Sequence, residues 1–197
     1  MDGLYALKPW YTRRLRVFTD RATIQCTSPD TFTLIGIFGA MAAAISIAVG
    51  WWPLAALWLA VRLAGANLDG AVARARNVSR PWGFVLNEIG DRASDLLMFA
   101  GLAVWAAHQG GPGLTWVLAA ALAATLPTFA SLAAAGAGAT RRNGGPFGKT
   151  ERCLAAIVAA AAPAAIAWVS AMIVVGSLVT AGLRLAAAHR ELTEVSK

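Results

Sequence analysis

Four acidic residues in the middle of this chain lie in stretches that are otherwise apolar. Glu88, Asp91 and Asp95 fall in one such stretch, and Asp69 falls in the stretch before it. A charged side chain inside a membrane-spanning segment costs several kcal/mol and by default faces a polar cavity or an ion pathway. The first hypothesis is therefore that these acids carry the chemistry of the protein.

The spacing of the acids places them on one helix face. Asn87, Asp91 and Asp95 recur every four residues. Glu88 precedes Asp91 by three residues, and positions three and four apart share a face. Carboxylates held so close repel one another unless a cation lies between them, and Mg²⁺, Mn²⁺ and Ca²⁺ prefer oxygen ligands. The pattern predicts a divalent-metal site, with Asp69 closing it from the preceding helix.

Residues beside Asp69 suit a phosphorylated substrate. Gly70 leaves the backbone open to a ligand. Arg74, one turn later, offers a planar fork that matches phosphate oxygens. Four further basic residues are expected to make the mouth of the site positive: Arg76, Arg80, Lys149 and Arg152. We therefore expect an anionic, phosphorylated substrate that enters from the cytoplasm.

Other interpretations of the acids stay open. They fit ion pairs with Arg62, Arg74 or Arg92 that only hold the helices together, and Arg92 fits such a partner better than a catalyst. A small cation transporter would use the acids as an ion path, although we find no internal repeat of the kind that many transporters show. A prenyl-transferring enzyme would need acid-rich D-x-x-D motifs, and the only comparable set here is the run from Asp69 to Asp91.

The elements that must position these residues are apolar segments of membrane-spanning length. Hydrophobic residues make up 58% of the 197 residues, charged residues 14%, and the mean hydropathy is +0.59. An average soluble domain carries roughly 25% charged residues, and a spanning helix needs about 20 apolar ones. We therefore expect an all-α integral membrane protein, a bundle of six transmembrane helices. The expected spans are residues 31–50, 53–75, 82–108, 113–137, 149–164 and 165–187.

A basic stretch precedes the first span. Residues 4–24 carry apolar side chains at spacings of three and four with arginines among them, which predicts an amphipathic juxtamembrane helix on anionic headgroups. A solvated basic helix is the alternative. The expected organisation is an N-terminal cytoplasmic or interfacial helix (1–28), a six-helix transmembrane domain (29–188) and a cytoplasmic tail (189–197).

The charge pattern indicates orientation rather than nucleic-acid binding. The net charge is +7 and the pI about 10.4, but lysines and arginines concentrate at alternate ends of the spans. By the positive-inside rule, both termini and the acidic site face the cytoplasm of a multi-pass inner-membrane protein. Cys26 and Cys153 are expected to be free thiols, and His108 and His189 interfacial residues rather than metal ligands.

The run from residue 66 to residue 91 resembles the signature of the CDP-alcohol phosphotransferase (CDP-alcohol phosphatidyltransferase) family, D-x2-D-G-x2-A-R-x8-G-x3-D-x3-D. Six positions match without a gap: Asp69, Gly70, Ala73, Arg74, Gly83 and Asp91. Two motif acids are replaced, the first by Ala66 and the third by Asn87. The chain therefore looks like a diverged member of the family.

The resemblance implies a reaction in phospholipid biosynthesis. A phosphatidyl group passes from a CDP-linked lipid such as CDP-diacylglycerol to a small alcohol acceptor, CMP is released, and Mg²⁺ or Mn²⁺ is required. It also implies a homodimer in the lipid bilayer. The alternatives are a catalytically impaired homologue that only binds CDP-lipid and the cation transporter.

The resemblance also assigns roles to residues. Asp91 is implied to be the catalytic base. The nucleotide pocket is implied to consist of Asp69, Gly70, Ala73, Arg74 and Gly83. The metal ligands are expected to be Asp69, Asp91, Asn87 and Glu88. Asp95 and the carbonyl of Asn67 are further candidates to replace the lost acids.

Overall fold

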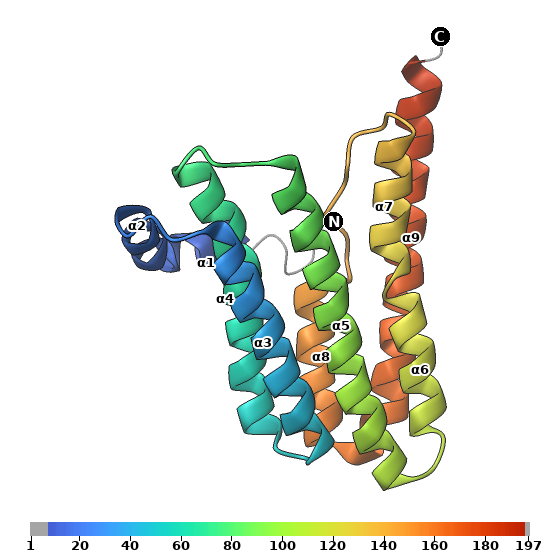
Figure 1. The fold of residues 1–197 in the computed structure, drawn as a ribbon. Coiled ribbons are helices and arrows are strands. Elements are labelled where there is room, and N and C mark those ends of the chain that lie inside the picture. Colours follow the sequence, from blue (N-terminus) through green and yellow to red (C-terminus); the bar gives the residue numbers. More distant parts are fainter. Residues whose placement is uncertain (1–7, 196–197) are drawn as a thin grey trace. The chain divides into compact units, whose positions relative to one another are not determined.

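The computed structural model describes residues 8–195, and within that range it contains helices and no strand. Those residues form two compact units, 8–108 and 109–195 (Figure 1). The predicted all-α class is confirmed. Residues 4–7 of the expected first helix lie outside the described residues.

The first unit contains the candidate site. Its helices are α1 (Lys8–Arg14), α2 (Arg16–Ile24), α3 (Pro29–Ala48), α4 (Trp52–Ala75) and α5 (Pro81–Gln109). Figure 1 shows α3, α4 and α5 as three long neighbouring helices. Prolines stand in the first turns of these three helices, where a missing N–H leaves no hydrogen bond unmade. The three predicted spans here agree with the observed helices to within two residues.

The basic stretch before α3 differs from the prediction. It was expected to be one helix over residues 4–24, but the described part is divided at Leu15 into α1 and α2. Trp10, Val17, Phe18 and Ile24 are exposed on these two helices. The amphipathic, membrane-surface role of this segment stays a prediction.

Small residues set the distances between the long helices. A β-carbon at Gly65 on α4 would lie 2.6 Å from the carbonyl oxygen of Phe32 and 2.8 Å from the backbone nitrogen of Gly36, both on α3. A β-carbon at Gly101 on α5 would collide with the carbonyl of Ala44 on α3. Such close backbone approach is typical of helix packing in lipid. It fixes α3 against both helices that carry the motif.

The second unit is organised along one long helix. Its elements are α6 (Gly113–Ala123), α7 (Leu126–Gly136), α8 (Lys149–Ala161), the short 3₁₀ helix η2 (Pro163–Ala165) and α9 (Ile166–Val195). Helix α9 packs along α6, α7 and α8. The 3₁₀ helix at Pro163–Ala165 separates α8 from α9, which confirms the predicted boundary between the spans 149–164 and 165–187. The predicted span 113–137 agrees with the apolar stretch Gly113–Gly136, although within this stretch the helix is interrupted just before Pro127, between α6 and α7.

Helix α9 also continues to Val195, beyond the expected end of the last span at residue 187. No glycine or proline follows Gly182 in the described sequence, so no local signal stops the helix. Glu191 holds its end, because its carboxylate accepts hydrogen bonds from the backbone and hydroxyl of Thr140 and pairs with Arg142. The predicted tail is therefore helical as far as the structure describes it.

Three helical stretches in the described chain are long and apolar enough to cross a membrane: Pro29–Ala48, Gly113–Gly136 and Pro163–Glu194. Helix α8, with 13 residues, is short for a span, which needs about 20. Helices α4 and α5 are long enough, but the acids and arginines of the candidate site lower their hydropathy. Several apolar helices are thus confirmed, whereas the count of six is not.

Candidate active site

Asp69 is the buried acid of the site. It lies in the last two turns of α4, and only 6% of its surface is exposed. One carboxylate oxygen, Oδ2, accepts a hydrogen bond from the hydroxyl of Thr33 on α3 at 3.0 Å, and Oδ1 accepts one from the backbone N–H of Gly70. These two donors satisfy one position on each oxygen and hold the carboxylate in a single orientation.

Thr33 contacts both helices that carry the motif. Its hydroxyl binds Asp69 on α4, while its methyl group lies 3.0 Å from where a β-carbon at Gly90 on α5 would stand. Gly90 directly precedes Asp91, so Thr33 binds one motif acid and packs against the residue before the other. We did not single out this residue from the sequence. The available signal was a threonine near the start of an apolar span, at the end where the acids lie.

Arg74 folds back over Gly70. A β-carbon at Gly70 would lie 3.1 Å from Nη1 of Arg74, so the absence of a side chain there leaves room for the guanidinium. Arg74 is exposed at the end of α4. Gly70 and Arg74 are therefore in contact, and the binding of a phosphate at this pair stays a prediction.

The other two arginines of this region are bound to the start of α3. Arg76 donates to the carbonyl oxygen of Thr27, and Arg80 forms an ion pair with Asp30. A β-carbon at Gly83 would lie 3.3 Å from Cγ of Arg80, so this motif glycine accommodates the arginine. Both arginines, expected at the mouth of the site, fix the α4–α5 connection. Lys149 and Arg152 belong to the second unit, and their expected contribution stays a prediction.

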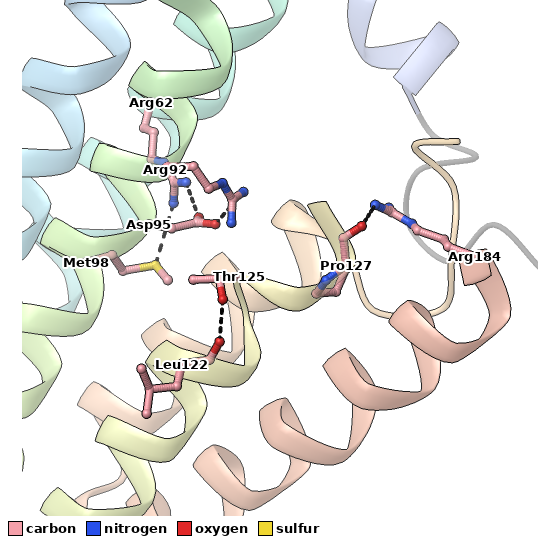
Figure 2. A network of polar contacts seen from close by, with 8 residues as sticks. All are labelled: Arg62, Arg92, Asp95, Met98, Leu122, Thr125, Pro127 and Arg184. Atoms are coloured by element: carbon pink, nitrogen blue, oxygen red, sulfur yellow. Dashed lines mark hydrogen bonds and ion pairs between the residues drawn. The ribbon is translucent and has the colours of Figure 1, made fainter. Parts of the chain in front are cut away.

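Asp95 lies between two arginines one turn deeper in α5 than Asp91. It forms an ion pair with Arg62 of α4, whose side chain is 1% exposed, and its Oδ2 lies 2.8 Å from Nη2 of Arg92 (Figure 2). Arg62 also points its Nη1 at the sulfur of Met98, 3.7 Å away. The alternative interpretation, in which an acid pairs with arginines and holds the helices together, is thus confirmed for Asp95 and Arg92. Both arginines hold the Asp95 carboxylate in this structure, so the structure does not support Asp95 as a replacement for a lost metal ligand.

Helix α1 approaches the motif from the N-terminal side. The hydroxyl of Thr12 donates to Oδ1 of Asn67 at 3.2 Å, so the Asn67 carbonyl, a candidate metal ligand, accepts a protein hydrogen bond. Burial raises the pKa of the neighbouring Tyr11 phenol. The contact ties the start of the chain to the candidate site.

The remaining oxygen donors fit a divalent ion only in part. Among the described residues, no three His, Cys, Asp or Glu side chains gather in a way that would hold a metal. Asp69 is buried, and Asn87, Glu88 and Asp91 are half-buried on α5. Mg²⁺ is commonly held by one or two carboxylates together with waters and substrate phosphates. This donor set fits a hard cation shared with a phosphate ligand rather than one enclosed by protein.

The sequence model of the CDP-alcohol phosphatidyltransferase family matches residues 26–181. The chain therefore belongs to the CDP-alcohol phosphatidyltransferase family. This confirms the resemblance that was carried by the motif between residues 66 and 91.

Known relatives agree with this family. The chain is 34% identical over 139 residues to the phosphatidylinositol phosphate synthase of Mycobacteroides abscessus, a match that spans 68% of this chain and 61% of that protein. The chain thus covers less than two thirds of the length of that curated relative.

Solved structures share the fold. The phosphatidylinositol phosphate synthase of Mycobacterium tuberculosis with CDP-DAG bound aligns with a TM-score of 0.76 and 25% identity, covering 88% of this chain and 94% of that one. The same enzyme in complex with manganese and citrate aligns with a TM-score of 0.75 and 24% identity, covering 87% of each chain. The manganese in that neighbour agrees with the expected use of Mg²⁺ or Mn²⁺ by the family.

Proposed function

We propose that this protein transfers a phosphatidyl group from a CDP-linked lipid, such as CDP-diacylglycerol, to an alcohol acceptor and releases CMP. The observation that carries the proposal is the intact nucleotide half of the motif, which includes the buried and oriented carboxylate of Asp69. Membership of the family and the likeness to a structure with CDP-DAG bound support it.

The donor would bind along the end of α4. Gly70 leaves room for the guanidinium of Arg74, and Gly83 leaves room for Arg80 at the start of α5. The small Ala73 adds little bulk beside them, and the planar fork of Arg74 suits a phosphate bound in two places. Asp69 completes this pocket from the interior. Arg74 also offsets the charge that develops on the phosphoryl group during transfer.

The reaction needs a base beside the acceptor. The acceptor hydroxyl oxygen attacks the phosphorus that carries the lipid oxygen, the bond between this phosphorus and the bridging oxygen of CMP breaks, and CMP leaves with that electron pair. Asp91 takes the proton of the hydroxyl. A divalent ion would be held by Asp69, Asp91, Asn87 and Glu88, and when bound it supplies positive charge to the phosphate oxygens.

We propose a phosphorylated inositol as the first acceptor to test, because the curated relative is a phosphatidylinositol phosphate synthase. The proposed setting is an inner membrane, with six spans, both termini and the site on the cytoplasmic side, and a homodimeric assembly. Helices α4 and α5, with 24 and 29 residues, are long enough to span, since a helix rises about 1.5 Å per residue.

One other function has a specific observation in its favour. Ala66 and Asn87 replace two motif acids, which favours a protein that binds CDP-lipid without turning it over. The two functions share the nucleotide pocket and differ in the fate of the donor.

Product analysis separates them. The purified full-length chain is incubated with CDP-diacylglycerol, Mg²⁺ or Mn²⁺, and separately with inositol phosphate, glycerol phosphate, serine or no acceptor. Acceptor-dependent release of CMP with formation of the matching phospholipid supports the transferase. CDP-diacylglycerol binding without CMP release under every condition supports the binding protein.

A further inference from the structure

The exposed face of α1 and α2 combines arginines with large apolar side chains. We infer that this face is a docking surface for anionic lipid headgroups, and that its occupancy holds the motif-bearing end of α4 in place. The inference goes beyond the proposed function, because it concerns a segment outside the motif and does not depend on turnover.

The apolar part of this face is broad. Val17 and Ile24 stand two turns apart on one side of α2, with 68% and 82% of their surfaces exposed, and Phe18 and Trp10 are more than half exposed. Helix α2 packs on α4 with its other side, where Ala22 is 3% exposed. Large apolar side chains on the outer side of a helix are typical of an interfacial helix whose apolar face enters the headgroup boundary.

The charged part of the face is positive. Four arginines on α1 and α2 are exposed: Arg13, Arg14, Arg16 and Arg21. Asp20 is the only acid in the sequence between residues 8 and 24, and its pair with Arg16, 3.8 Å long, is exposed and therefore weak. The guanidinium of Arg14 lies 5.5 Å from the centre of the Trp10 ring. Four arginines beside one acid favour an anionic lipid surface over a neutral one.

The chain itself keeps this face beside the bilayer. Helix α3 begins at Pro29 and is long and apolar enough to cross a membrane. Only residues 25–28 join it to α2, and four residues span at most about 14 Å. Figure 1 shows both short helices to one side of α3, at the end where α3 begins. This position favours a lipid surface over a nucleic acid or an acidic protein as the partner.

Two contacts join this segment to α4, one on either side of motif residues 69–74. Before them, the hydroxyl of Thr12 donates to Oδ1 of Asn67 at 3.2 Å. After them, Arg76 donates to the carbonyl oxygen of Thr27, between α2 and α3. Helix α1 has seven residues, and a helix of that length is marginal without outside contacts. A lipid surface that orders α1 and α2 therefore also strengthens their hold on α4.

Hydrogen exchange read by mass spectrometry tests the surface. The purified full-length chain is placed in lipid nanodiscs of phosphatidylcholine, or of a two-to-one mixture of phosphatidylcholine and phosphatidylglycerol. We expect the backbone amides of residues 10–24 to exchange at least about tenfold more slowly in the anionic discs, since each arginine near such a surface raises the affinity roughly fivefold. Equal exchange in the two kinds of disc would overturn the inference.

Charge variants test whether the arginines are the cause. R13Q/R14Q/R16Q should lose most of the difference between the discs, whereas R13K/R14K/R16K keeps the charge and should retain most of it. R190Q, an exposed change on α9, should behave as the parent does. A glutamine variant that keeps the full difference counts against the inference.

The last turns of α4 report the link to the motif. The amides of residues 68–76 should also exchange more slowly in the anionic discs. Thr12→Val removes the donor to Asn67, so it should keep the slow exchange of residues 10–24 and lose most of the gain at residues 68–76. An undiminished gain at residues 68–76 in Thr12→Val would overturn the link.

Equilibrium dialysis of CDP in the same discs separates this inference from the proposed function. A parent chain that binds CDP in neither disc but shows the differences in exchange would refute the proposed nucleotide pocket and support this inference. CDP binding together with equal exchange in both discs would support the pocket and overturn the inference.

Discussion

The hydroxyl of Thr33 on α3 donates a 3.0 Å hydrogen bond to the carboxylate of Asp69 on α4 in a buried position. The bond joins a helix without motif residues to the acid around which the nucleotide half of the motif is arranged. A buried carboxylate that loses a donor also loses its fixed orientation. Thr33 is therefore expected to matter for binding of the donor although it lies outside the motif.

The first prediction concerns this bond. Thr33→Val keeps the shape of the side chain and removes the donor, which should weaken CDP binding by about tenfold, since a hydrogen bond to a charged group contributes roughly 1.5–3 kcal/mol. Thr33→Ser should retain most of the affinity. Thr31→Val, at an exposed position of α3, is the matched control. Dialysis of CDP measures all three, and equal affinities for Thr33→Val and the parent would refute the role.

The buried ion pair of Arg62 and Asp95 gives a prediction about stability. Asp95→Leu leaves Arg62 without its ion-pair partner and should destabilise the protein by about 3–5 kcal/mol. The double variant Arg62→Met/Asp95→Leu removes both charges and should recover much of that loss. Thermal unfolding in detergent measures the stability of the parent, the single variant and the double variant.

An exposed pair serves as the comparison for that cycle. Arg16 and Asp20 on α2 lie 3.8 Å apart with 81% and 62% of their side chains exposed. Removing either should cost less than about 1 kcal/mol, because water screens exposed pairs. A similar loss for both pairs, or a double variant no better than Asp95→Leu, would contradict the buried-pair interpretation.

Close packing of α3 on α4 predicts an effect of a single methyl group. Gly65→Ala places a β-carbon 2.6 Å from the Phe32 carbonyl, so the helices must separate. Overpacking of this kind costs about 1–3 kcal/mol. Gly182→Ala, where no atom lies within 4 Å of the new carbon, should be neutral or stabilising. The melting temperatures of the two variants measure this difference. A Gly65→Ala variant as stable as Gly182→Ala would refute the close approach of α3 and α4 at Gly65.

The hydrogen bonds of Arg184 in the second unit lead to a prediction about protease sensitivity. Its guanidinium donates to the carbonyl oxygens of Pro127, Asn143 and Gly144 at 2.7–2.9 Å, and Figure 2 shows the contact with Pro127. Arg184→Met should release residues 137–148 and speed tryptic cleavage after Arg141 or Arg142. Arg190→Lys, an exposed change on the same helix, should leave the cleavage rate at the parent value, and equal rates for both variants would argue against this role of Arg184.

Much of the architecture could be predicted from the sequence. Prolines in the first turns of the helices mark boundaries locally, so the bounds of α3, α4 and α5 were predicted to within two residues. The division of α6 from α7 was missed, because uniform alanine composition hid the one local signal, Pro127. The continuation of α9 to Val195 was missed because a polar sequence does not by itself end a helix.

The candidate site was predictable where its signal lay in spacing. The motif residues on α4 and α5 are identified by their intervals, and Arg62 and Arg92 were correctly considered as partners of the acids. The hydrogen bond from Thr33 to Asp69 and the pairing of Asp95 with two arginines depend on how α3, α4 and α5 pack. Such contacts between helices have no signature in a single sequence.

The proposed reaction rests on Asp91 as the base that takes the acceptor proton. The most direct test is the kcat of CMP release from CDP-diacylglycerol, with the acceptor and metal that give most product, for Asp91→Asn and for Asp20→Asn, an exposed acid on α2. Asp91→Asn should lower kcat by at least about 100-fold, since a positioned base contributes roughly 10²–10⁴-fold, while Asp20→Asn stays at the parent rate. CMP release by Asp91→Asn at the parent rate would contradict the proposed mechanism.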